Sequence, residues 1–147
     1  MHAKVVLQLV GSMDHLRLVW QTGETLLESV TFAEDPEGNR YNVLLAVQEM
    51  VTNVLRHGYH HDEHEPIEIE FALTNEQLQI ELRDRGPEFD PIAHGETEAA
   101  AGNEMPTEAG GFGIHIAQMV MDELSYVRRD GWNCLRLTKE IAVKAGI

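Results

Sequence analysis

The spacing of apolar residues changes along this sequence, and the change restricts what the chain can fold into. Between residues 39 and 56, apolar side chains recur every three or four positions, which predicts one amphipathic helix. Residues 67–73 and 78–82 instead alternate apolar with polar side chains, which predicts two half-buried strands. The turn between them is short, so these strands should pair antiparallel. A long helix followed by an antiparallel hairpin favours an α+β fold.

The remaining segments fit the same architecture. We expect an edge strand at residues 4–10, helical structure from 12 to about 30, a helix at 112–123, and strands at 124–129 and 132–138. Gly23 interrupts the first helical segment, so one kinked helix and two short helices are both open. Asp130-Gly131 is a strong hairpin signal. The sequence predicts a single domain over residues 1–147, a two-layer sandwich whose mixed, mostly antiparallel sheet carries helices on one face.

The composition argues against several classes of protein. The formal net charge of −14 disfavours direct binding of nucleic acid, which depends on Lys and Arg that neutralise phosphates. The sequence shows no signal peptide and no apolar run long enough to span a bilayer, so we expect a cytoplasmic protein without a membrane anchor. The single cysteine, Cys134, fits a reducing compartment, and its strand-like setting favours a small buried hydrophobic residue over a nucleophile.

Three polar residues, Glu49, Asn53 and His57, follow one another at spacings of four on the strongest predicted helix. Each step of four drifts by about 40° around a helix axis, so the three lie within roughly 80° of one another. They flank the apolar positions, so one face of the helix could look into a pocket. An Asn oxygen suits Mg²⁺, and a Glu can accept a proton or orient a water. The alternative is a solvated helix face with an incidental spacing.

Two glycine-containing segments follow this helix. Asp84-Arg-Gly86 ends a predicted strand, where the carboxylate can accept from an exocyclic amine and the glycine lets a ring approach the backbone. Residues 93–109 show no clear period and predict a long loop, which is either functional or disordered. Gly110-Gly111-Phe112-Gly113 then opens a helix, where backbone N–H groups favour an anion. The alternatives are a plain Asp-x-Gly turn and glycines that only anchor a flexible loop.

The order of these three blocks resembles the nucleotide-binding boxes of the GHKL ATPase superfamily, which gyrase, MutL and sensor histidine kinases share. The closer resemblance is to bacterial anti-sigma factor serine/threonine kinases. The matching stretches are Glu49-Met-Val-Thr-Asn53-Val-Leu-Arg-His57-Gly-Tyr59, Asp84-Arg-Gly86-Pro-Glu-Phe-Asp-Pro91 and Gly110-Gly-Phe-Gly113-Ile114, followed by Met121-Asp-Glu-Leu124. The resemblance extends from about residue 40 to about residue 140, and it implies the histidine-kinase-like ATPase fold.

The resemblance also implies roles for the residues of the predicted helix. Asn53 would coordinate the Mg²⁺ that accompanies ATP. Glu49 would be the general base that activates a serine or threonine hydroxyl of the substrate. His57 belongs to the same nucleotide-binding block, where it either lines the site or holds the helix end.

The later blocks would bind the nucleotide itself. By the same resemblance, Asp84 would recognise the adenine amine, and Gly86 would lie beside the ring. The helix start, with Gly111, Phe112 and Gly113, would place backbone donors on the phosphates. Residues 93–109 would form the ATP lid.

The implied reaction is phosphoryl transfer from ATP to an anti-sigma antagonist, by a protein that also sequesters a sigma factor. Catalysis would come mainly from positioning and charge neutralisation. Relatives are often dimers, so a homodimer is among the expected partners. A gyrase-type motor and a sensor histidine kinase are disfavoured, because the sequence shows neither a transducer domain nor a preceding helix pair with a phospho-acceptor.

One departure from the family pattern concerns charge. Residues 86–127 contain eight acidic residues and no Lys or Arg, whereas many relatives place a basic residue near the lid. Phosphate contacts would then fall to Mg²⁺ and backbone amides, or to Arg56, Arg85 or a partner. The alternative function is therefore a non-catalytic or very slow nucleotide-binding module that regulates a partner by association.

A histidine-rich segment follows the predicted helix and raises the question of a metal site. Imidazoles at such spacings could bind Zn²⁺ or Ni²⁺. The segment is predicted to be a loop without fixed geometry, which disfavours a physiological site. The residues concerned are His57, His60, His61, Asp62, Glu63, His64 and Glu65.

Overall fold

The computed structural model describes residues 3–59, 64–93 and 111–141 of the chain, and its main elements there are a five-stranded sheet and the α-helices that cover it. The strands are β1 (Ala3–Val10), β2 (Pro66–Leu73), β3 (Gln77–Asp84), β4 (Glu123–Arg129) and β5 (Trp132–Glu140). The helices are α1 (Leu16–Leu27), α2 (Pro36–Asn53) and α4 (Gly111–Val120). None of the helices in these described ranges has the length and apolar character that a membrane crossing needs.

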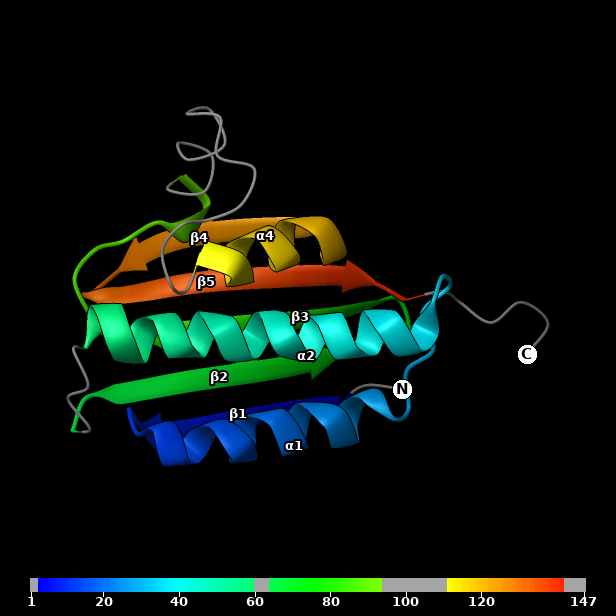
Figure 1. Cartoon of the computed structure of the whole chain (residues 1–147), viewed down its shortest axis with the longest axis horizontal. Coiled ribbons are helices and arrows are strands. Elements are labelled where there is room, and N and C mark those ends of the chain that lie inside the picture. Colours follow the sequence, from blue (N-terminus) through cyan, green and yellow to red (C-terminus); the bar gives the residue numbers. More distant parts are fainter. Residues whose placement is uncertain (1–2, 60–63, 94–110, 142–147) are drawn as a thin grey trace.

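The sheet has the spatial order β1-β2-β3-β5-β4, and the helices α1, α2 and α4 all cover one of its faces (Figure 1). The predicted two-layer α+β sandwich is therefore confirmed. Each pair of neighbouring strands is antiparallel, so the described part of the sheet is more regular than the mixed sheet that we expected. The predicted edge strand is confirmed as well, since β1 lies at one margin and pairs only with β2 in the described sheet.

Gly23 permits close helix packing rather than ending a helix. The structure has a single helix α1 from Leu16 to Leu27, preceded by a 3₁₀ turn at Met13–His15, so the two-helix alternative is wrong. Gly23 is buried, and a Cβ atom at this position would come within 2.6 Å of Leu44 Cδ2. The glycine therefore lets α1 approach α2 closely.

The helix α2 begins earlier than the apolar pattern predicts and changes form at its end. Asp35 caps the start, because its Oδ1 accepts a hydrogen bond from Gly38 N at 3.3 Å, and Pro36 occupies the first turn, where no backbone N–H is needed. After Asn53 the chain continues as a π-helical turn, Val54–Gly58, which Tyr59 N closes by donating to Val54 O at 2.8 Å. The wider turn shifts every residue beyond Asn53 around the helix axis.

The core lies between the helices α1, α2 and α4 and the inward rows of the strands. Alternation along the strands places Phe71, Ile80 and Leu137 in register on this face, and each is at most 2% exposed. Burial of one such side chain contributes about 1.5–3 kcal/mol. The β4–β5 hairpin turns at Asp130 and Gly131 with φ values of 52° and 82°, so the predicted hairpin is confirmed, with the backbone conformation that an Asp-Gly turn favours.

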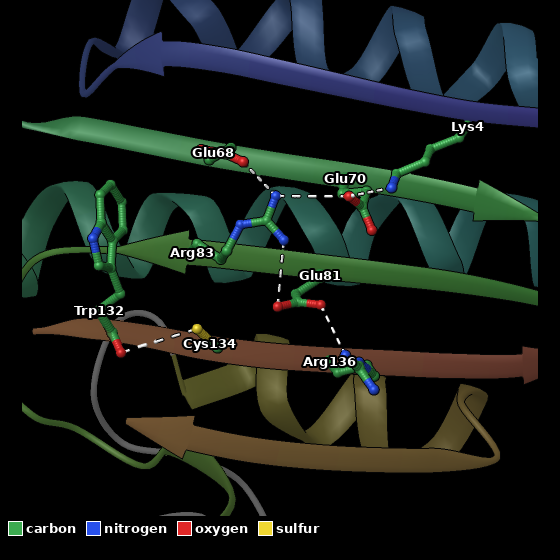
Figure 2. Close-up of polar contacts among 8 residues, drawn as sticks. All are labelled: Lys4, Glu68, Glu70, Glu81, Arg83, Trp132, Cys134 and Arg136. Atoms are coloured by element: carbon green, nitrogen blue, oxygen red, sulfur yellow. Dashed lines mark hydrogen bonds and ion pairs between the residues drawn. The ribbon is translucent and has the colours of Figure 1, made fainter. Parts of the chain in front are cut away.

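The helix-free face of the sheet carries a ladder of alternating charges across its central strands (Figure 2). Arg83 pairs with Glu68, with Glu70 at 3.8 Å and with Glu81 at 3.3 Å. Arg136 lies on the other side of Glu81, at 3.1 Å. Because one arginine contacts three carboxylates, it offsets the repulsion between acidic residues on adjacent strands.

Cys134 lies on this helix-free face and is only partly buried, so the prediction of a buried hydrophobic position is wrong. The reason is strand alternation: Asn133 and Leu135 take the inward positions, and Cys134 between them points outward. Partial burial raises the pKa of its thiol above the ordinary value, and the nearby Glu81 carboxylate acts in the same direction. The raised pKa disfavours the thiolate, which agrees with the expectation that this cysteine is not a nucleophile.

Candidate functional site

Asp84 is a carboxylate held on the helix-covered face at the end of β3. It is 7% exposed, and its Oδ1 atom accepts hydrogen bonds from Gly86 N at 2.9 Å and from Asn133 Nδ2 at 3.0 Å. Burial raises the pKa of Asp84, while the two hydrogen bonds and the Arg128 guanidinium oppose that rise. A buried carboxylate fixed through one oxygen is suited to accept a hydrogen bond from a ligand at the other.

Asn133 belongs to this site although the sequence analysis did not identify it. It comes from β5, is 6% exposed, and pairs in register with Asp84. A signal was present in the sequence: extrapolating the alternation of Leu137 and Leu135 by one more step puts an amide on the buried face. A polar side chain at an inward strand position needs partners, and here the partner is the candidate adenine-binding carboxylate.

Tyr59 joins the end of the helical segment to the strand that carries Asp84. Its hydroxyl donates to Pro66 O and accepts from Arg85 N at 2.7 Å. Burial raises the pKa of Tyr59 to about 12, and the backbone hydrogen bond from Arg85 acts against the rise. The first two sequence blocks are therefore connected directly through one side chain, which sequence spacing alone did not indicate.

Glu49 and Asn53 lie one turn apart near the end of α2, on the α-helical part of the segment, and both are partly buried. The Oδ1 atom of Asn53 is shielded from solvent. The π-helical turn begins directly after Asn53, so the α-helical spacing that placed His57 on the same face does not apply beyond this point. The side chain of His57 lies outside the description, and its role stays a prediction.

The third block forms the start of α4, as the glycine pattern predicts. The helix begins at Gly111 and packs alongside α2. In Figure 1, α4 begins in the same half of the molecule in which α2 and β3 end. The backbone N–H groups of its first turn, which includes Gly111 and Gly113, have no helical acceptors of their own and can serve an anion. The side chain of Phe112 and the predicted lid, except Ala93, lie outside the described residues.

Two arginines near Asp84 have different surroundings. Arg85 lies over the Trp132 ring, with its guanidinium carbon 5.5 Å from the ring centroid, and Trp132 comes from the outward row of β5. Arg128 donates through Nη1 to Gly86 O at 2.7 Å and to Asn133 Oδ1 at 3.0 Å. Arg85 thus points away from the helix-covered face. Arg128 instead holds the backbone at Gly86 and the side chain of Asn133 in place beside Asp84.

The amide oxygen of Asn53 suits a cation that arrives with a phosphate ligand. Within residues 3–59, 64–93 and 111–141, no group of three or more His, Cys, Asp or Glu residues could hold a metal ion. A single amide oxygen from Asn53 agrees with Mg²⁺ chemistry, because Mg²⁺ keeps several waters and takes phosphate oxygens as ligands. The histidine-rich segment is described only in part, with His64 exposed, so its predicted lack of a metal site stays a prediction.

Comparison with known proteins identifies the family to which this chain belongs. A family model of the histidine kinase-like ATPase domain matches residues 12–139. The serine/threonine-protein kinase BtrW of Bordetella bronchiseptica is 28% identical over 103 residues, which cover 70% of this chain and 72% of that protein. The serine-protein kinase RsbW of Listeria innocua is 26% identical over 152 residues, covering 98% of this chain and 91% of that protein.

Two further similarities are shorter or structural. The anti-sigma F factor of Oceanobacillus iheyensis is 31% identical over 81 residues, which cover 55% of each chain. A crystal structure of the RsbU and RsbW domains of Rv1364c from Mycobacterium tuberculosis matches 95% of this chain with a TM-score of 0.65 at 17% identity, and the match spans 32% of that longer chain. The latter similarity supports the fold. Since the family model covers most of the sequence, this chain belongs to the histidine kinase-like ATPase family.

Proposed function

We propose that this protein binds Mg-ATP and transfers its γ-phosphoryl group to a serine or threonine of an anti-sigma antagonist. The observation that carries the proposal is the buried Asp84, anchored at Oδ1 on the helix-covered face and joined through Tyr59 to the end of the α2 segment. Such a carboxylate suits the exocyclic amine of adenine. The kinase names of the relatives in Bordetella and Listeria support the same reaction class.

The chemistry needs three groups of this chain around the nucleotide. Asn53 would hold Mg²⁺, which supplies charge neutralisation at the phosphates. The first turn of α4 would direct the N–H groups near Gly111 and Gly113 at the phosphate oxygens. Glu49 would accept the proton of the substrate hydroxyl as its oxygen bonds to the γ-phosphorus and the bond to ADP breaks.

The regulatory part of the proposal concerns partners. One relative is named an anti-sigma F factor, and we propose that this chain likewise holds a sigma factor and is released from it through the antagonist. A homodimer is the assembly that we propose by resemblance to this family. The acidic surface agrees with a protein partner rather than nucleic acid, since nucleic acid would be repelled at a net charge of −14.

A second function is favoured by one observation, the absence of Lys and Arg from residues 86–127. Positive charge near the γ-phosphoryl group stabilises the transition state more than it stabilises bound ATP. A site with little such charge can bind the nucleotide without fast transfer. The protein would then regulate its partner by association alone.

The deciding experiment compares wild type with Glu49→Gln, which keeps the size of the side chain and removes the base. Calorimetry with Mg-ATP measures binding, and labelled ATP with the antagonist measures transfer. We expect both proteins to bind, and transfer by the variant to fall by about 10²–10⁴-fold. Glu37→Gln, at the exposed start of the same helix, is the matched control and should behave like wild type.

The two functions give different results in this experiment. Binding by both proteins without transfer by either would select the non-catalytic module. Absence of ATP binding by wild type would overturn both functions.

A further inference from the structure

The polar cluster behind Asp84 does more than the proposed function requires. Its centre is Asn133, a buried amide on β5 that contacts the base-recognition carboxylate, two backbone carbonyls and three donors. We propose that Asn133 is a positioning residue that presents Asp84 to the base as a hydrogen-bond acceptor and so makes the site select an amine over a carbonyl. This inference rests on the proposed binding of ATP, and it adds the residue that sets base preference.

The hydrogen-bond donors around Asn133 fix the orientation of its amide. Arg128 Nη1 lies 3.0 Å and Phe89 N lies 3.4 Å from one end of the amide, and both atoms can only donate. That end must therefore be the oxygen, Oδ1, which also accepts from the Tyr126 hydroxyl. The opposite end is then Nδ2, which faces Asp84 and cannot be flipped without placing donors against donors.

The nitrogen end of the amide uses its hydrogens on the site itself. Nδ2 donates to Asp84 Oδ1 at 3.0 Å and to Pro87 O at 2.9 Å, with Gly86 O further away at 3.4 Å. One side chain thus holds both the carboxylate and the backbone that follows it. Because the contacts lie on either side of Gly86, they also fix where a ring can approach that glycine.

The consequence for Asp84 is that its two oxygens are not equivalent. Both of its hydrogen bonds in the described part of the chain go to Oδ1, from Gly86 N and Asn133 Nδ2. Both donors are N–H groups, which favour the ionised carboxylate over the neutral acid, and Oδ2 is left to meet the ligand. An unprotonated Oδ2 accepts from an amine, whereas a carbonyl in the same place would face acceptor against acceptor.

Replacing the amide by a carboxyl should weaken this preference. In Asn133→Asp two carboxyl groups would lie about 3 Å apart and share one proton, as paired carboxyls do. The shared proton would lie between Asp84 Oδ1 and the new carboxyl, so Asp84 would lose negative charge and Oδ2 would become a weaker acceptor for an amine. Asn133→Leu removes the donor without adding an acid, and so leaves Asp84 free to turn.

The test measures base preference rather than stability. Calorimetry gives the dissociation constants of Mg-ATP and of Mg-inosine triphosphate, which carries a carbonyl in place of the adenine amine. We expect wild type to prefer ATP by at least about tenfold, and both Asn133 variants to fall below about threefold. Asn75→Asp makes the same chemical change at an exposed position between β2 and β3, and should retain the wild-type ratio.

The ratio separates positioning from a merely structural role. A variant that only loosens the fold weakens both nucleotides equally and keeps the ratio, and that result in a folded Asn133→Leu or Asn133→Asp protein would overturn the inference while leaving the proposed function intact. Should the aspartate variant not fold, the leucine variant decides alone. Wild type that binds neither nucleotide would overturn the proposed function itself, and the inference with it.

Discussion

Replacing Tyr59 with phenylalanine removes a single hydroxyl that joins the π-helical turn to the strands on either side of the site. The hydroxyl makes two hydrogen bonds, to Pro66 O and from Arg85 N at 2.7 Å. Phenylalanine fills the same volume, so no cavity forms. Each lost bond costs about 0.5–1.5 kcal/mol, and somewhat more where the backbone partner stays dry, so Tyr59→Phe should lower the free energy of unfolding by about 2–3 kcal/mol.

The pH dependence makes this prediction specific to the hydroxyl. Burial raises the pKa of Tyr59 in the folded protein to about 12, from an ordinary value of 10.0. The unfolded chain therefore loses this proton first as pH rises, and the stabilisation present below pH 10 is lost between about 10 and 12. At pH 11 the free energy of unfolding of wild type should therefore be about 1.4 kcal/mol lower than at pH values below 10. The variant lacks the hydroxyl and should show no such loss from residue 59.

The assay is urea unfolding followed by circular dichroism at several pH values between 8 and 11. The difference in unfolding free energy between wild type and Tyr59→Phe should shrink as pH rises. Tyr41→Phe is the matched control, because Tyr41 is 56% exposed, and its difference should stay within about 0.5 kcal/mol at every pH. A difference in unfolding free energy between wild type and Tyr59→Phe that is large but constant with pH would refute the argument from burial. A difference near zero would show that the two hydrogen bonds do not stabilise the fold.

Three further predictions test other parts of the molecule. Gly23→Ala should destabilise the fold by about 1–2 kcal/mol in urea unfolding, because overpacking against Leu44 outweighs the gain in helix propensity; a stabilised variant would mean that α1 can move away from α2. Arg83→Met should cost about 1–3 kcal/mol, because Glu68, Glu70 and Glu81 lose a shared cation, and the loss should shrink at high salt. The raised pKa of Asp84 should make Mg-ATP affinity fall, as pH is lowered, at a higher pH than an ordinary aspartate would; calorimetry from pH 8 down to about pH 4 would contradict this if affinity stayed constant.

Local periodicity predicted most of the fold because each central element buries one face. The alternation of residues 67–73 and 78–82 is the same alternation that the structure places against α2, and a register slip would have exposed the entire apolar row. Gly23 shows the limit of local rules. A glycine within a predicted helix is usually interpreted as a break. In the structure, Gly23 instead allows close contact with Leu44, which is distant in sequence.

The polar part of the site could be predicted only where its residues follow one another closely. Glu49 and Asn53 share a helix turn, and the three blocks appear in a recognisable order. Asn133 and Tyr59 act on residues 49 and 26 positions away, and nothing local to either reveals its partner. The π-helical turn after Asn53 is a similar case, since its apolar spacing fits an ordinary α-helix equally well.

The structure also narrows the question of where positive charge for phosphoryl transfer can come from. The sequence left Arg56, Arg85 and a partner as sources besides Mg²⁺ and backbone amides. Arg85 is occupied with Trp132 toward the helix-free face, because the residue after an inward Asp84 must point outward. Two of these sources of positive charge then remain: Arg56, which is exposed in the π-helical turn, and the partner. If the partner supplies the charge, the site gains its transition-state stabilisation only when the substrate protein is bound, so ATP alone would be held without being consumed.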